Sequence, residues 1–152
     1  MNYWLMKSEP DECSIDNALA APKGLTPWTG VRNYQARNYM RDAMRVGDGV
    51  LFYHSSCPEP GIAGLAEVAS APYVDPSQFD KKSDYYDPKS KREAPRWYCV
   101  DVRAKKKIKL IPIAELQKHA ALRKMWTLRP GNRLSITPVS AAEWKFICSR
   151  LR

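Results

Sequence analysis

Residues 49–70 read GVLFYHSSCPEPGIAGLAEVAS, and this stretch decides the fold. It holds two apolar runs, 49–55 and 61–70, which are separated by the proline- and glycine-containing turn 58–61. Apolar runs of this length on either side of such a turn are typical of two neighbouring antiparallel strands. The stretch therefore predicts a β-hairpin in the middle of the chain.

Further strands and helices are expected on both sides of this hairpin. Residues typical of strands predict them at 2–7, 97–111 and 133–137. Apolar periodicity and capping residues predict helices at 14–20, at 33–47, at 113–125 and after Ser140. The helix at 33–47 has Asn33 as its cap and Gly47 as its terminator, and Ser140 forms a capping box with Glu143. These elements do not alternate as βαβ units, so we expect an α+β fold with a small curved sheet or barrel and helices outside it.

Length and charge bound the class of protein. The chain has 152 residues, with 25 Lys and Arg against 16 Asp and Glu, a formal net charge of +9 and 44% hydrophobic residues. This composition predicts a single domain over residues 1–152 with a basic surface, and it excludes a disordered tail. No apolar stretch is long enough to cross a bilayer, and residues 1–10 do not resemble a secretory signal. We therefore expect no membrane contact and a cytoplasmic protein, nucleoid-associated if bacterial.

The usual signatures of catalysis and cofactor binding are missing from the sequence. Its four cysteines form no C-x-x-C pair, zinc-ligand spacing is absent, and free thiols are expected. Neither a phosphate-binding loop nor a dinucleotide fingerprint is present. His54 and Cys57 lie close together in a turn, but no third group orients them. We expect no cofactor, no metal and no catalytic residue.

Aromatic residues interleaved with cations are the most informative pattern in the chain. They occur near Lys7, around Trp28 to Arg37, and in 71–96, a loop of 26 residues with four prolines. Nucleic acids offer both stacking faces and phosphates to such a surface. The alternative is that most aromatic residues are core and that the charge only favours solubility. For Trp28 a loop position favours a binding role, whereas Arg32 is open to a phosphate contact or to a structural pair, for example with Asp42.

Two motifs resemble a known family. YWLMKSEP at residues 3–10 and WTGVRNYQARN at residues 28–38 are similar to the EVE domain family, and the likeness extends over nearly the whole chain. The resemblance implies a PUA-like curved β-barrel with flanking helices, related to YTH and ASCH domains. It also implies a pocket for a modified base, with modified cytosine in DNA favoured.

The same resemblance implies particular site residues. In YTH domains a Lys-Ser-Asn segment at the end of the first strand and a Trp on the next loop line the base pocket. The matching residues are Lys7, Ser8 and Glu9, followed by Trp28 and Thr29. Glu9 stands where a methyladenine reader has Asn, and a carboxylate accepts a hydrogen bond from the amine of cytosine.

The remaining site residues come from the cation and aromatic pattern. Tyr73, Phe79, Tyr85 and Tyr86 are the candidates for a second pocket wall, and Tyr85 and Tyr86 are assigned to the pocket. Phosphate contacts are expected from Arg32, Arg37, Lys89, Lys91 and Arg92. The predicted function is a non-catalytic reader of a modified base. An RNA reader with the same pocket, or an enzyme acting on a modified base or nucleotide, is the alternative, and the oligomeric state is left open.

Overall fold

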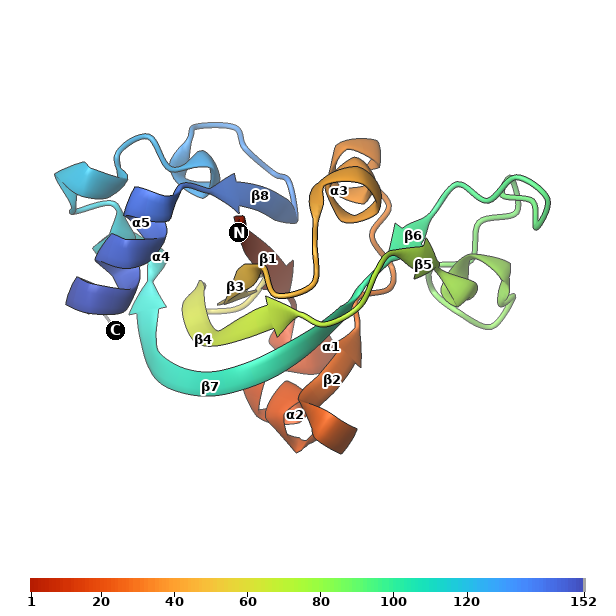
Figure 1. Ribbon diagram of the computed structural model, residues 1–152, viewed down its shortest axis with the longest axis horizontal. Coiled ribbons are helices and arrows are strands. Elements are labelled where there is room, and N and C mark those ends of the chain that lie inside the picture. The colour runs from red at the N-terminus through yellow and green to blue at the C-terminus, as the bar shows by residue number, and fades with distance from the viewer. Residues whose placement is uncertain (152) are drawn as a thin grey trace.

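The computed structural model describes residues 1–151, which fold into a curved mixed sheet with short helices around it (Figure 1). The sheet has the strand order β2-β7-β4-β3-β1-β8. Its strands are β1 (Tyr3–Ser8), β2 (Leu25–Pro27), β3 (Gly49–His54), β4 (Gly61–Val68), β7 (Asp101–Pro112) and β8 (Ile136–Val139). Two further short strands, β5 (Tyr73–Val74) and β6 (Tyr98–Cys99), pair with each other. The helices are α1 (Pro10–Cys13), α2 (Ile15–Ala20), α3 (Tyr34–Asn38), α4 (Ile113–Leu116) and α5 (Ala141–Phe146).

The predicted hairpin is confirmed and forms the middle of the sheet. Strands β3 and β4 pair antiparallel from Gly49 opposite Glu67 to His54 opposite Gly61. Strand β1 lies between β3, to which it is parallel, and β8, to which it is antiparallel. This arrangement places the carboxyl end of β1 beside the residues that precede β8.

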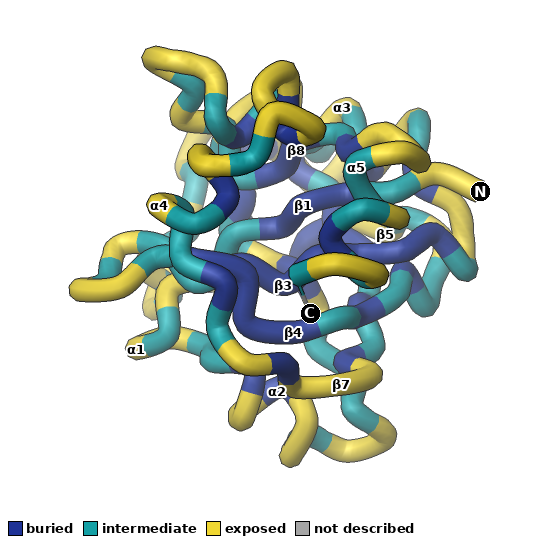
Figure 2. Tube along the Cα trace, turned by 90° about the vertical axis from the view of Figure 1, so that its left-hand side faces the viewer, coloured by how far each residue is buried: buried dark blue, intermediate teal, exposed yellow. Residues whose placement is uncertain are grey.

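Curvature comes from the long strand β7, which follows β4 through two irregularities in register. The edges β2 and β8 do not pair with each other within residues 1–151, so the sheet is curved but not closed. Alternation along β1 directs Trp4 and Met6 into one apolar cluster and Leu5 into another on the opposite face. Figure 2 shows the resulting pattern, with β1, β3 and β4 deeply buried. The α+β class and the curved sheet with flanking helices are thus confirmed.

Capping signals located helix starts correctly, whereas helix ends differ from the prediction. Asn33 caps α3 by accepting the Ala36 N–H at 3.0 Å, and both halves of the Ser140 capping box are present at α5. The helix after Asn33 passes into a π-helical turn, Tyr39–Ala43, and ends there with Met44 as the C-cap, rather than near Gly47.

The predicted helix at 113–125 is wrong. It stops at Leu116, and single 3₁₀ turns follow at Ala120–Leu122 and Trp126–Leu128. On one continuous helix Leu116 and Met125 would point about 180° apart. The broken path allows both of them, together with Leu122, to be fully buried in the same cluster.

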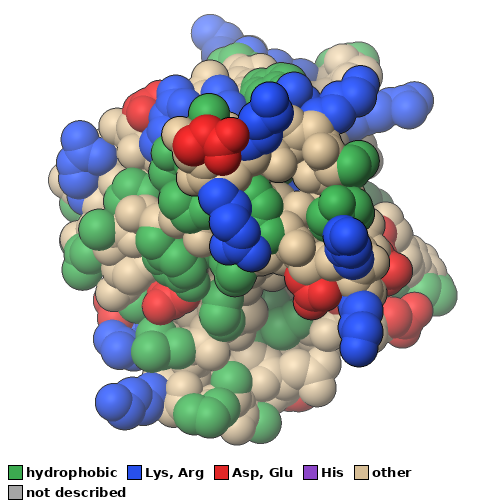
Figure 3. All heavy atoms as spheres, turned by 90° about the vertical axis from the view of Figure 1, so that its right-hand side faces the viewer, with side chains coloured by type: hydrophobic (Ala, Val, Ile, Leu, Met, Phe, Trp, Pro, Cys, Tyr) green, Lys and Arg blue, Asp and Glu red, His purple; other side chains and the backbone are tan. Residues whose placement is uncertain are grey.

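Smaller differences concern strand boundaries and the long loop. The last strand begins three residues later than predicted, at Ile136, and the expected strand at 97–111 divides into β6 and β7. The loop 71–96 is ordered by a buried amide, because Gln78 donates to the carbonyls of Asp75 and Trp97 at 2.6 and 2.8 Å. On the face that carries this loop, Lys and Arg side chains lie among Asp and Glu (Figure 3).

Three further findings concern residues 1–151 as a whole. Cys13, Cys57 and Cys99 are free thiols. No group of three His, Cys, Asp or Glu side chains in this part of the chain is placed to hold a metal ion. None of its helices has the length and apolar character needed to span a membrane.

Candidate functional site

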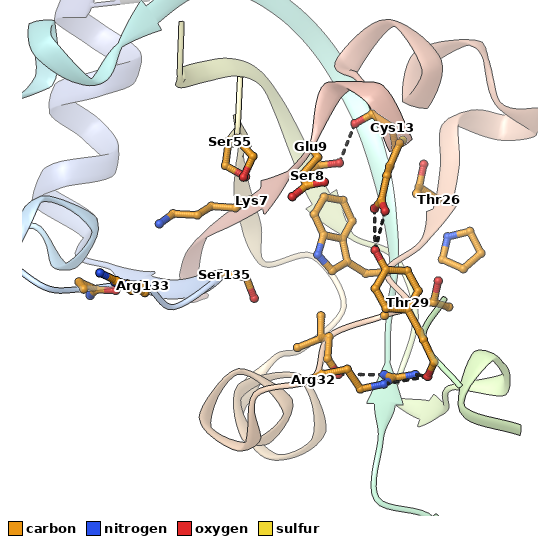
Figure 4. A pocket seen from close by; sticks show the side chains of 18 residues that line it. Lys7, Ser8, Glu9, Cys13, Thr26, Thr29, Arg32, Ser55, Arg133 and Ser135 are labelled. Atoms are coloured by element: carbon orange, nitrogen blue, oxygen red, sulfur yellow. Dashed lines mark hydrogen bonds between the residues drawn. The ribbon is translucent and has the colours of Figure 1, made fainter. Parts of the chain in front are cut away.

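A cavity of about 620 Å³ opens at the carboxyl end of β1, and we call it the β1 pocket (Figure 4). Its walls come from the end of β1, the loop between β2 and α3, the 71–96 loop and the residues before β8. The structure brings together six of the seven residues assigned to a base pocket, namely Lys7, Ser8, Glu9, Trp28, Thr29 and Tyr85. The seventh, Tyr86, does not line the pocket, and neither do Tyr73 and Phe79. Tyr85 is therefore the second aromatic wall.

Trp28 belongs to the core and to the pocket wall at once. Only 7% of it is exposed, and its ring packs edge-on against Phe52 with centroids 5.5 Å apart. Its backbone N–H donates to the carbonyl of Val100 at 2.8 Å, which fixes the loop on the sheet. The core and binding interpretations of Trp28 are thus not exclusive.

The indole N–H of Trp28 is the unusual feature of this wall. Among residues 1–151, three tryptophans are buried. Trp4 donates its N–H to Asp48 at 3.0 Å, and Trp97 donates its N–H to Asp87 at 2.7 Å. The indole N–H of Trp28 donates to no atom of the described chain, and its nitrogen is not completely shielded from solvent. A buried donor that faces a cavity without a partner is available to a ligand.

Tyr85 is held against the opposite wall by two contacts. Its ring lies over Gly30, where an added Cβ would approach the ring carbons to 2.8 Å. Its hydroxyl donates to the Glu12 carboxylate at 2.7 Å, as the dashed lines in Figure 4 show. This hydrogen bond, together with partial burial, raises the pKa of Tyr85 to about 12. The phenol therefore stays neutral at physiological pH.

Arg32 positions this wall from behind. All five of its N–H groups donate within the chain. They bond to the carbonyls of Tyr85 and Val31, to Oδ2 of Asp75 at 3.2 Å and to the Ser77 hydroxyl. Asp75 is fully buried and also accepts the Gly30 N–H at 2.8 Å. Of the two roles considered for Arg32, the structural one is observed, and its partner is Asp75 rather than Asp42. No donor of Arg32 is left for a phosphate.

The polar residues at the end of β1 divide into used and unused groups. The Ser8 hydroxyl donates to the Cys13 carbonyl at 2.6 Å and closes the turn into α1. The Glu9 carboxylate is exposed and accepts no hydrogen bond within the described chain. Lys7 makes no ion pair there, and burial lowers its pKa. Glu9 and Lys7 are therefore available to a ligand of the β1 pocket.

Cys13 is a pocket residue that sequence reasoning did not single out. Burial raises the pKa of its thiol, so the thiol is protonated at neutral pH. A protonated thiol is a poor nucleophile.

Arg133 is the main addition to the predicted site. The pairing of β1 with β8 brings the preceding residues to the pocket, and the Lys7 N–H donates to the Ser135 carbonyl at 2.8 Å. Asn132, Arg133 and Ser135 all line the β1 pocket. Arg133 is exposed and has no acidic partner in the described chain, and it lies on the same flank as Lys7 (Figure 4). The signal that could have identified it is the run of cations without acids that precedes β8.

The other cations predicted to contact phosphate lie away from the pocket. Arg37 donates to the Arg96 carbonyl at 2.8 Å and to the Asn38 side chain, and its guanidinium lies 4.7 Å from the Tyr34 ring centroid. Arg92 lies over Phe79 at 4.6 Å. The remaining two, Lys89 and Lys91, are exposed on the 71–96 loop. None of the four lines the β1 pocket.

Comparison with known proteins extends the resemblance carried by the two motifs. Human thymocyte nuclear protein 1 is 44% identical over an alignment that covers 97% of this chain and 73% of the human protein. A crystal structure of human THYN1 in complex with DNA containing 5-methylcytosine matches with a TM-score of 0.93 at 42% identity, covering 98% of this chain and 96% of that one. A hypothetical protein from Leishmania major matches with a TM-score of 0.89 at 50% identity, covering 97% and 92%.

The family assignment rests on nearly the full length of the chain. Residues 2–150 match the EVE domain. Human thymocyte nuclear protein 1 is similar to this chain in sequence, and the human THYN1 structure is similar to it in fold. The chain therefore belongs to the EVE domain family.

Proposed function

We propose that the chain is a non-catalytic DNA-binding module that reads a modified cytosine in the β1 pocket. The observation that carries the proposal is the unpaired indole N–H of Trp28, which lies in a cavity that also holds the Tyr85 ring and the unused Glu9 carboxylate. Human THYN1, which is 42% identical, was crystallised with DNA containing 5-methylcytosine, and this supports the choice of ligand.

The chemistry of cytosine fits these groups. A base removed from its stack loses a few kcal/mol, which a pocket must return through aromatic contact and hydrogen bonds to the base edge. Trp28 and Tyr85 supply aromatic walls for that contact. The edge of cytosine has one amine donor beside ring and carbonyl acceptors. Glu9 would accept from the amine, and the Trp28 N–H would donate to an acceptor.

Binding explains the site without a reaction. The pocket's thiol, Cys13, has a raised pKa, and Arg32 is fully occupied in holding the wall. The walls are fixed by core packing of Trp28 and by the Tyr85 to Glu12 hydrogen bond. A rigid, preformed pocket of this kind lowers the ordering cost of binding a base.

The test uses a panel of oligonucleotides that differ only at the cytosine C5 substituent, on matched DNA and RNA backbones at fixed salt. We expect the wild-type chain to prefer a C5-modified cytosine in DNA. Trp28→Phe keeps an aromatic ring and removes the N–H, so it should weaken binding of the preferred oligonucleotide by about 1–2 kcal/mol, the effect of losing one partly buried hydrogen bond. The matched control is Trp144→Phe, which removes the same atoms from a ring stacked on Tyr3 outside the pocket.

Each alternative has its own outcome in this experiment. Equal affinity for all C5 substituents would contradict reading of a modified cytosine. A preference for the RNA backbone would favour the RNA reader, and turnover of the oligonucleotide, detected by mass spectrometry, would favour an enzyme. Equal effects of Trp28→Phe and Trp144→Phe would show that the pocket N–H does not contact the base.

A further inference from the structure

We propose that a nucleic-acid strand with its base in the β1 pocket continues over residues 117–133, where Arg123, Lys124, Arg129 and Arg133 hold its phosphates. The inference rests on the proposed function and adds the path of the strand outside the pocket. We call residues 117–133 the basic segment.

The charge of the basic segment is uniform and uncompensated. It contains five Lys and Arg residues, and the chain has no acidic residue between Glu115 and Glu143. One of the five, Lys118, pairs with Glu115 at 3.5 Å. The other four are exposed and make no ion pair within the described chain. When unpaired cations of this kind neutralise phosphates, the counterions condensed on the nucleic acid are released.

Three neighbouring hollows, the first of which is the β1 pocket, follow this segment and share lining residues. Asn132 and Arg133 line the pocket and also a second hollow of about 330 Å³, which they share with Trp126 and Arg129. Trp126 and Arg129 in turn line a third hollow of about 850 Å³, together with Arg123, Lys124 and the start of α5. Each hollow thus shares residues with the next, and the cations follow the same line.

The third hollow also contains one carboxylate, which forms no ion pair with the four cations in the described chain. Glu143 is the only acidic residue among the residues that line it. Its carboxylate accepts the Ser140 backbone N–H at 2.9 Å in the capping box of α5. It neutralises none of the four cations, since the structure places no ion pair between them.

The basic segment is held in place by packing and hydrogen bonds, although it has little regular structure. Leu122 and Met125 are fully buried and anchor it to the core. The side chain of Asn132 donates to the Trp126 carbonyl at 2.7 Å and accepts the Leu134 N–H at 2.9 Å. Because the backbone is already held in place, phosphate binding does not have to order it first.

Arg129 shows how these cations differ from Arg32. Its guanidinium lies 4.2 Å from the Trp126 ring centroid, and only its Nε donates within the chain, to the Lys124 carbonyl at 3.3 Å. The N–H groups of its two terminal nitrogens have no partner in the described residues. A planar guanidinium that is stacked in place with free donors suits bidentate hydrogen bonding to two oxygens of a phosphate.

The test compares two DNA oligonucleotides that contain the same modified cytosine, one of about 12 nucleotides and one a trinucleotide with the modified cytosine at its centre. The variant Lys124→Gln/Arg129→Gln removes two exposed charges outside the β1 pocket. We expect the slope of log affinity against log salt to fall by about 1.4 on the longer oligonucleotide, which is about 0.7 per phosphate contact on a single strand. Binding of the trinucleotide should not change.

A matched control removes the same charge elsewhere. Lys106→Gln/Lys109→Gln takes two exposed, unpaired lysines from β7, and neither lysine lines the β1 pocket. This control should leave the slope unchanged. The single variant Arg123→Gln should lower it by about 0.7 and provides a second, independent measurement.

The outcomes separate this inference from the proposed function. An unchanged slope for both basic-segment variants, with the C5 preference intact, would overturn the strand path and leave the base reader standing. An equal fall in the β7 control would also overturn it, because net charge alone would then explain the effect. Loss of any C5 preference in the wild-type chain would instead reject the proposed function.

Discussion

The 71–96 loop and the basic segment are alike in sequence and different in use. Both lack regular structure over most of their length. The loop carries several aromatic residues among its cations, and the basic segment carries Trp126. They lie on opposite sides of the molecule, the loop beside α3 and the basic segment beside α5 and β8 (Figure 1). The 71–96 loop has six Lys and Arg residues against five Asp and Glu residues. The basic segment has five Lys and Arg residues and no Asp or Glu.

This difference shows that the use of a charged side chain depends more on its partners in the fold than on how many charges the region carries. The loop directs the side chains of Asp75 and Gln78 inward, and the contacts among Asp75, Arg32 and Tyr85 build a wall of the β1 pocket. The basic segment buries apolar side chains and leaves four of its five cations without an ion pair in the described chain. The loop therefore shapes the site, and the basic segment is suited to hold what enters it.

The strongest test of the loop's structural role is Asp75→Asn. This change removes a fully buried carboxylate and leaves the Arg32 guanidinium without its ion pair. We expect the free energy of unfolding to fall by about 3 kcal/mol, because breaking one side of a buried pair leaves an uncompensated charge. Urea unfolding measures the loss. The control Asp84→Asn, an exposed carboxylate in the same loop with no hydrogen bond of its own, should stay within about 0.5 kcal/mol of wild type. Equal losses of stability in the two variants would contradict a structural role that is particular to the buried Asp75 carboxylate.

A smaller effect is expected when the pocket wall loses its hydroxyl. Tyr85→Phe removes the hydrogen bond to Glu12 and should cost about 1 kcal/mol of stability. Because the folded-state pKa of about 12 is above the ordinary value near 10, this contribution is complete below about pH 10 and is lost as the pH rises toward 12. Unfolding of both proteins from pH 8 upward should show the difference shrinking. A difference that stays constant to high pH would contradict a role for the phenol proton.

The smallest effect is expected from the exposed lysines of the loop. Lys89→Gln/Lys91→Gln removes two charges that do not line the β1 pocket and that lie among acidic neighbours. We expect the salt dependence of binding to change by less than about half of the change seen for Lys124→Gln/Arg129→Gln on the same oligonucleotide. A fall of equal size would show that the strand contacts both sides of the molecule, and the contrast between the two regions would then be lost.

Local signals in the sequence predicted much of the fold. The β3–β4 hairpin, the Asn33 cap and the Ser140 capping box depend on neighbouring residues, and all three are present. The helix at 113–125 failed because burial of Leu116 and Met125 in one cluster overrode local helix preference. That constraint comes from the curved sheet and cannot be read from a short window of sequence.

The site was predictable where a motif was continuous and not where distant strands meet. Lys7, Ser8 and Glu9 follow one another, and all three line the β1 pocket. Their contact with a base stays a prediction. Arg133 reaches the same pocket only through the pairing of β1 with β8, strands separated by more than 120 residues. Its position at the pocket depends on the strand order, because the run of cations that precedes β8 does not itself show which residues it faces.

The close contact of Gly30 with Tyr85 limits how this pocket can vary. Gly30 has a φ of +84°, and any side chain there would meet the Tyr85 ring at 2.8 Å. A library of variants at position 30 would therefore retain glycine for two independent reasons, backbone strain and lost space. Shrinking residue 85 would relieve the second reason and leave the first. Members of a lineage that remodel this wall must thus change the ring or the loop path first, while position 30 stays constant.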